Sequence, residues 1–146
     1  MENNLDKRYQ TLVILWFALL MSIGMYFLFS LFVAPQASNQ LGSPSRSLLI
    51  VALNALGTFL VVVSFPVKHK LMERAVEKQD TALVQKALVI ACAMCEVSAL
   101  LGLLEYFVIG NREYYLLFLV AAAGTALHFP RRRQLEAASY KNPAPG

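Results

Sequence analysis

Residues 87–104 read ALVIACAMCEVSALLGLL, an apolar run with a single ionisable side chain, Glu96, near its middle. At 1.5 Å per residue, a helix of this length nearly crosses a bilayer core of ~30 Å. An ionisable group at that depth costs about 2.5 to 3.5 kcal/mol on insertion scales, so it normally faces protein or water. Glu96 is therefore the first candidate for a working site.

The composition places the whole chain in the membrane class. Of its 146 residues, 58% are hydrophobic and 15% are charged, whereas soluble domains have roughly 25% charged residues. The formal net charge of +4 does not indicate nucleic acid, because the Lys and Arg residues lie almost entirely outside the apolar runs. A strand-binding surface would instead interleave basic and aromatic residues. The expected partner is the lipid bilayer, with no nucleic acid.

Four apolar runs predict four membrane-spanning helices, at residues 11–33, 47–66, 85–109 and 112–129. The expected fold class is all-α, a four-helix transmembrane bundle forming one domain over residues 1–146. The first run is too long for the core of a signal peptide, so we expect it to be retained. Gly110 is expected to end the third helix in the left-handed conformation. The fourth run is short for the bilayer core.

The distribution of Lys and Arg predicts the orientation. Two lie before the first run, five between the second and third runs, and four in the tail, whereas the other two loops have one each. By the positive-inside rule, both termini and the middle connection are cytoplasmic. The expected location is a multi-pass position in the bacterial inner membrane.

The middle connection, residues 67–84, is charged but has apolar residues at helical spacing. One interpretation is a solvated helical extension of the second span, with Asp80 or Thr81 capping the third helix. The other is a platform for a partner or for anionic lipid head groups. The tail, residues 130–146, is expected to be cytoplasmic.

Small residues at helical spacing predict a packing face on the third helix, made by Ala91, Cys95, Ala99 and Gly102. Small side chains at such spacing let helix backbones approach closely. Cys92 and Cys95 also form a CxxC pair, but they lie in the cytoplasmic half and the chain has no second cysteine pair to relay oxidation. Packing is therefore the favoured role for these cysteines.

Depth along the spans predicts a polar layer around Glu96. Measured from the outer ends of their spans, Ser22, Thr58 and Thr125 lie at about the level of Glu96, and Asn54 lies one turn further out. If these side chains converge, they surround a carboxyl that burial would keep neutral. The alternative is that the Ser and Thr hydroxyls bond to their own backbone. A second carboxyl, Glu105, is expected near the outer interface, in reach of water and outside the site.

Residues 91–104, ACAMCEVSALLGLL, resemble the carboxylate-bearing helix of rotary ATPase proteolipids, the c subunits. In both, a Glu is followed by small and aliphatic residues and a Gly-Leu pair. The resemblance implies that Glu96 binds and releases a proton or a sodium ion. It is confined to this helix, and the second run has only Gly57 where c subunits have a dense glycine repeat. It therefore assigns no family to the whole chain.

The two histidines, His69 and His128, are expected at the cytoplasmic ends of the second and fourth spans. Such a pair could ligate a haem between helices, or the rings could lie among the lipid head groups. The sequence contains no Gly-rich phosphate loop, hydrolase triad or metal-ligand cluster. We expect no cofactor.

These features favour a non-enzymatic function, an accessory or oligomer-forming subunit of a membrane complex. The partner is then a second copy of the chain or a larger membrane assembly. A first alternative is proton or ion translocation with Glu96 as the protonation site. A second alternative is a redox subunit that holds haem or quinone through His69 and His128.

Overall fold

The computed structural model describes residues 2–33 and 43–139, and within them every regular element is helical. This confirms the all-α prediction. The predicted loop after the first span and the end of the tail, residues 34–42 and 140–146, lie outside the described residues. The elements are α1 (Glu2–Phe32), α2 (Ser43–Glu77), α3 (Thr81–Leu104), the π-helical turn η1 (Glu105–Ile109), α4 (Tyr115–Leu127) and α5 (Arg132–Ser139).

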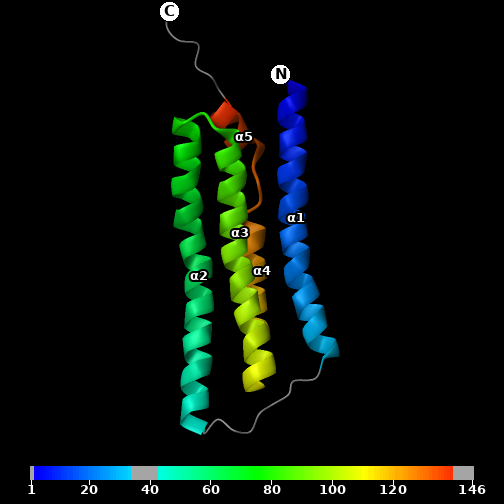
Figure 1. Cartoon of the computed structure of the whole chain (residues 1–146), viewed down its shortest axis with the longest axis vertical. Coiled ribbons are helices and arrows are strands. Elements are labelled where there is room, and N and C mark those ends of the chain that lie inside the picture. Colours follow the sequence, from blue (N-terminus) through cyan, green and yellow to red (C-terminus); the bar gives the residue numbers. More distant parts are fainter. Residues whose placement is uncertain (1, 34–42, 140–146) are drawn as a thin grey trace, which may run out of the picture.

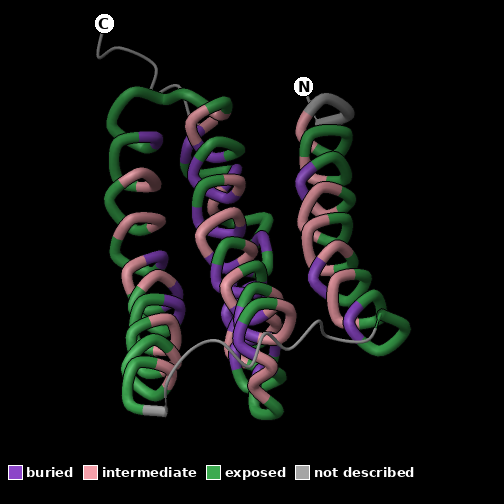
Figure 2. The backbone as a smooth tube through the Cα atoms, turned by 60° about the horizontal axis from the view of Figure 1, so that its bottom comes forward, coloured by how far each residue is buried: buried purple, intermediate pink, exposed green. Residues whose placement is uncertain are grey.

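Helix α3 is the central element of the fold. It packs against α2, α4 and α1, and α1 and α2 lie on opposite sides of it (Figure 1). Buried residues follow α3 and α4, whereas much of α1 and α2 is exposed (Figure 2). The start of α1, the α2–α3 turn and α5 lie at one end of the molecule. We call it the basic end, because most of the Lys and Arg residues lie there.

Within residues 2–33 and 43–139, three helices are long and apolar enough to cross a membrane, in the segments Leu5–Phe32, Pro44–Glu77 and Thr81–Ile109. Large hydrophobic side chains on α1 and α2 are exposed, for example Phe17 at 53% and Phe59 at 60%. In lipid these faces need no protein cover, since the bilayer core is itself apolar. The exposed apolar surface is therefore consistent with a membrane protein.

The fourth predicted span is shorter than expected. Its helix, α4, has 13 residues, Tyr115–Leu127, rather than the predicted range 112–129. At 1.5 Å per residue it measures about 20 Å. Residues 112–114 form a turn instead, because Gly110 adopts the left-handed conformation (φ 67°) and ends the preceding helix, as predicted.

The second predicted span does not end at Pro66. Helix α2 continues through Pro66 to Glu77 without a break. A proline removes one backbone hydrogen bond, but membrane helices tolerate this where neighbouring helices support them. The connection after Pro66 is therefore largely an extension of α2, and Asp80 caps α3 by accepting a hydrogen bond from the backbone N–H of Ala82 (2.8 Å).

Helices α2, α3 and α4 approach closely at glycines. A Cβ added to Gly124 of α4 would lie 2.6 Å from Cγ1 of Val61 and 3.0 Å from Sγ of Cys95. A Cβ on Gly57 of α2 would lie 2.7 Å from a methyl carbon of Leu117. The absence of side chains at these positions thus sets the spacing of the three helices.

The tail contains a short amphipathic helix, α5, that the sequence did not indicate. Leu135 and Ala138 are buried, and they join a core cluster contributed by the other helices: Leu12, Ala75, Val84, Leu88 and Cys92. On its exposed side, Arg132 forms ion pairs with Asp6 of α1 (2.9 Å) and Glu136 (3.1 Å). Helix α5 therefore covers the basic end of the fold.

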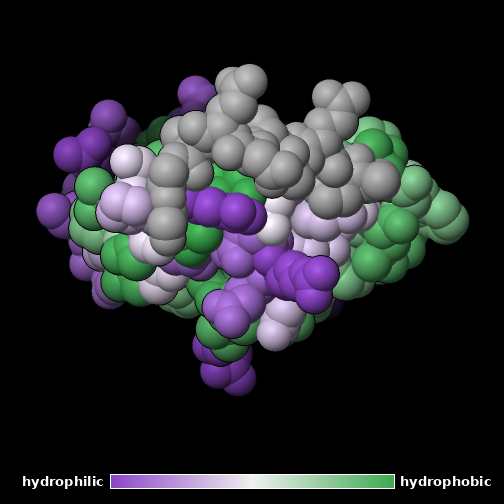
Figure 3. Space-filling view, turned by 90° about the horizontal axis from the view of Figure 1, so that it is seen from below, coloured by the Kyte–Doolittle hydropathy of each residue, from purple (hydrophilic) through white to green (hydrophobic). Residues whose placement is uncertain are grey.

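The opposite end of the molecule carries the turn between η1 and α4. Figure 3 looks onto this end and shows hydrophilic side chains near the centre beside hydrophobic side chains on the flank. Asn111 organises the turn, since its Oδ1 accepts a hydrogen bond from the N–H of Glu113 (3.2 Å).

Candidate functional site

Glu96 joins α3 to α1 through hydroxyl groups. Ser22 and Tyr26 both donate to its Oε1, at 2.5 Å and 3.0 Å, and the Glu96 side chain is only partly buried. Ser22 was predicted at this level, whereas Tyr26 was missed. Tyr26 lies one helical turn after Ser22 on the same face of α1, and this spacing could have predicted its contact with Glu96.

Among the residues whose burial is described, Glu105 carries the one fully buried carboxyl, at 0% exposure. The expectation that it reaches water is wrong. Asn54 of α2 donates to its Oε1 (2.5 Å), and Asn111 donates to its Oε2 (3.0 Å). The carboxyl lies at the start of η1, and the π-helical turn continues to Ile109. Such turns occur frequently at functional sites.

The predicted polar layer does not assemble around Glu96. Ser22 reaches Glu96, but Asn54 reaches Glu105 instead. Thr58 is exposed on α2. Thr125 is fully buried in α4, and its backbone carbonyl accepts a hydrogen bond from the Trp16 indole (2.7 Å). Residue count gives the depth of a side chain but not its direction around the helix, so equal depth did not bring these groups together.

The predicted packing face of α3 is turned into the protein. Ala91, Cys95 and Ala99 are at 0% exposure, and Gly102 is buried. A Cβ on Gly102 would lie 3.1 Å from the carbonyl oxygen of Tyr114, at the start of α4. Cys92 and Cys95 are both buried with free thiols. These residues form the contact between α3 and its neighbours.

The histidines lie at the basic end, in different surroundings. His128 is 1% exposed, and its Nε2 lies 2.7 Å from Oγ of Ser64 on α2. His69 is exposed and forms an ion pair with Glu73 (3.5 Å). The use of these histidines as haem ligands stays a prediction. Among the described residues, no group of three or more His, Cys, Asp or Glu side chains could hold a metal ion.

The polar groups within the apolar body thus connect helices. Besides the bonds of Glu96, Glu105 and His128, Ser30 of α1 bonds to the Tyr114 hydroxyl (3.2 Å). Hydrogen bonds between membrane helices are worth about 0.6 kcal/mol on average. Several of them together with the glycine contacts hold α1, α2 and α4 against α3.

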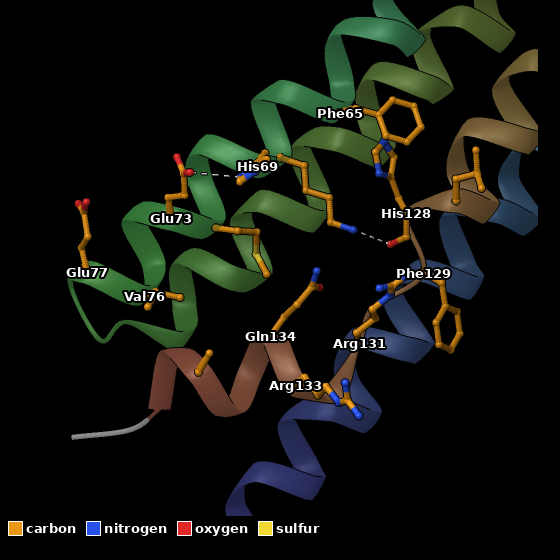
Figure 4. A pocket seen from close by; sticks show the side chains of 14 residues that line it. Phe65, His69, Glu73, Val76, Glu77, His128, Phe129, Arg131, Arg133 and Gln134 are labelled. Carbon is orange, nitrogen blue, oxygen red and sulfur yellow. Dashed lines mark hydrogen bonds and ion pairs between the residues drawn. The ribbon is translucent and has the colours of Figure 1, made fainter. Parts of the chain in front are cut away.

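We describe three of the open grooves on the surface of the described residues. A groove of about 960 Å³ lies at the basic end between α2 and α5 (Figure 4). A second, of about 680 Å³, separates α2 from α4 and is lined by Asn54, Ala55, Thr58 and Glu113 among apolar residues. A third, of about 400 Å³ between α1 and α4, is almost wholly apolar. Each of these grooves is open to lipid or protein.

Comparison with known proteins identifies neither a fold relative nor a family for this chain. The resemblance of residues 91–104 to c subunits therefore stays a prediction. The chain was compared with protein-family models, curated proteins and solved structures, and no match was found.

Proposed function

We propose that this protein is a non-enzymatic, four-pass membrane subunit that associates side by side with copies of itself or with other membrane proteins. In this arrangement α1 to α4 form a four-helix bundle, and both termini are cytoplasmic in the bacterial inner membrane. Helix α4 is short, so its flanking residues complete the crossing or the bilayer is locally thin.

The observation that carries the proposal is the groove between α2 and α4. Its wall on α2 includes two small residues, Ala55 and Thr58, both exposed. Within the described residues, the Thr58 hydroxyl has no hydrogen-bond partner. Interfaces between membrane helices are enriched in Gly, Ala, Ser and Thr, because small side chains allow close approach and hydroxyls bond across the contact. The groove therefore has the character of a surface that receives another helix.

The test compares two alanine-to-leucine variants. Ala55→Leu fills the groove, whereas Ala18→Leu adds the same side chain on the exposed face of α1. Native mass spectrometry after extraction in mild detergent should give an assembly for the wild type and for Ala18→Leu. Ala55→Leu should be monomeric. A wild type that is monomeric and carries no other protein would refute the proposal, as would an Ala55→Leu protein that assembles normally.

A second candidate function is proton or ion binding at Glu96. The specific observation is that Glu96 is partly accessible at the α1–α3 contact, whereas Glu105 is fully covered. Dicyclohexylcarbodiimide, which modifies protonated carboxyls in membranes, should then label Glu96 and spare Glu105. Proteoliposomes should show an ion flux that Glu96→Gln abolishes. An unlabelled Glu96, or no flux with the wild type, would argue against this function.

A further inference from the structure

The groove at the basic end joins a charged region to an apolar one. It lies between the second half of α2, the link between α4 and α5, and α5 itself (Figure 4). Its volume is about 960 Å³. The lining residues include three Lys or Arg side chains, two histidines, two acidic side chains and several large apolar ones, and this combination is not repeated in the other two grooves.

The guanidinium groups of two arginines at this groove have no partner among the described residues. The Arg131 and Arg133 side chains are exposed, and neither guanidinium group forms an ion pair or a hydrogen bond with another described residue. Arg132, between them, points elsewhere and pairs with Asp6 and Glu136. Arg131 and Arg133 therefore line the groove, whereas Arg132 contacts α1 and α5. A guanidinium binds phosphate oxygens in a two-pronged geometry.

The third cation that lines this groove is the ammonium group of Lys68. Lys68 is partly buried, and its Nζ donates to the carbonyl oxygen of His128 (3.0 Å). An ammonium group has three hydrogens, so this bond leaves donors for a ligand. The acidic residues lie further along α2, and Glu73 is already paired with His69. The region near Arg131 and Lys68 is therefore the electropositive part of the groove.

The apolar part of the groove continues toward the membrane-spanning segments. Phe65, Leu127 and Phe129 line it and are 40%, 72% and 44% exposed. The Phe65 ring packs on His128 (centroids 4.5 Å apart), and Phe129 packs on Trp16 (5.0 Å). Fixed aromatic rings beside an exposed leucine form a surface that hydrocarbon chains can cover.

We propose that this groove binds an anionic glycerophospholipid. The phosphate lies between Arg131 and Arg133, with Lys68 beneath it, and the acyl chains extend along Phe65 and Leu127. Basic pockets at the ends of membrane helices favour anionic head groups, and each Lys or Arg near the surface contributes about fivefold to the affinity. The apolar lining distinguishes this ligand from a soluble phosphate, which would need only the cations. This inference is independent of the proposed association through the α2–α4 groove.

The experiment titrates delipidated, purified protein with dioleoylphosphatidylglycerol or dioleoylphosphatidylcholine in detergent and counts bound lipids by native mass spectrometry. The wild type should bind dioleoylphosphatidylglycerol at least about tenfold more tightly than dioleoylphosphatidylcholine. The variant Arg131→Gln/Arg133→Gln should lose about 10- to 30-fold in affinity for the anionic lipid, since two surface charges are removed. Its affinity for the zwitterionic lipid should change little.

The matched control is Lys70→Gln/Arg74→Gln, which removes the same charge from exposed positions of α2 that do not line the groove. It should keep the lipid preference within about twofold. A further arm adds glycerol 3-phosphate, which should not displace the lipid at equal concentration. Equal affinity for both lipids, an equal loss in the control variant, or competition by glycerol 3-phosphate would each overturn the proposal.

Discussion

At the scale of residues, two carboxyl groups within the apolar body differ in how they are covered. Glu96 receives two hydroxyl donors and stays partly accessible, whereas Glu105 receives two amide donors and is fully buried. A buried carboxyl that accepts at both oxygens depends on both donors, because each lost bond leaves a desolvated polar atom. Asn54 therefore contributes to stability mainly through Glu105.

We predict a measurable coupling between Asn54 and Glu105. In a double-mutant cycle with Asn54→Ala and Glu105→Ala, the coupling free energy should be about 1 to 2 kcal/mol, above the average of about 0.6 kcal/mol for membrane helices. The coupling free energy is measured by denaturing the protein with SDS and following the helical circular dichroism signal. The control cycle pairs Asn54→Ala with Glu113→Ala, whose carboxyl is exposed in the same groove. Its coupling should be within about 0.5 kcal/mol of zero. Equal coupling in both cycles would contradict the assignment.

The sequence predicted part of this arrangement. Ser22 was placed at the depth of Glu96, and the two groups do meet. Glu105 was taken for an interfacial residue because it lies near the end of an apolar run. Its burial depends on Asn54 from another helix and on Asn111 from the turn that follows. Such tertiary cover cannot be read from position along one helix.

At the scale of elements, the contacts of α4 depend on positions without a side chain. Gly124 meets Val61 of α2 and Cys95 of α3. Val61 is β-branched and has little rotamer freedom in a helix, so it cannot move aside easily. On α1, by contrast, nothing lies within 4 Å of a Cβ built on Gly24.

We therefore predict opposite effects for two glycine substitutions. Gly124→Ala should destabilise the protein by about 1 to 3 kcal/mol, the usual cost of overpacking. Gly24→Ala should be neutral or stabilising by up to about 1 kcal/mol, because alanine is the better helix former. Thermal unfolding followed by circular dichroism in detergent compares the two. A stable Gly124→Ala protein would show that α4 does not pack as described.

A second prediction at this scale concerns α5. Leu135 is 2% exposed within the core cluster at the basic end, whereas Leu119 on α4 is 62% exposed. Leu135→Ala should release α5, because truncating a buried leucine costs about 2 to 5 kcal/mol. Amide hydrogen exchange in α5 should accelerate at least about tenfold. Leu119→Ala should leave it unchanged, and equal protection in both variants would contradict the docking of α5.

Element boundaries show which signals were strong in the sequence. Asp80 and Gly110 mark helix ends through local chemistry: Gly110 was predicted, and the cap of α3 was narrowed to Asp80 or Thr81, of which Asp80 is the one used. Pro66 was taken as an end, but packing of α2 on α3 carries the helix through it. Helix α5 was missed because its apolar face consists of only Leu135 and Ala138. Too few apolar residues were present there for a periodic pattern to predict a helix.

At the scale of the whole molecule, the number of times the chain crosses the lipid decides which parts of the chain share a compartment. Three helices are long enough by length and composition, and the crossing by α4 is the proposed fourth. The start of α1, the α2–α3 turn and α5 lie at one end of the structure. If all four helices cross, that end faces one compartment and the turn before α4 faces the other.

Labelling of single cysteines by a membrane-impermeant maleimide in oriented vesicles tests this most directly. The wild type is the blank, because both native thiols are buried. The variants are Lys7→Cys, Lys78→Cys, Glu113→Cys and Ala137→Cys, all at exposed positions. We predict that Lys7→Cys, Lys78→Cys and Ala137→Cys react from the cytoplasmic side and Glu113→Cys only from the opposite side. Reaction of Glu113→Cys and Lys78→Cys from the same side, or of Ala137→Cys from the side opposite to Lys78→Cys, would contradict the four-pass arrangement.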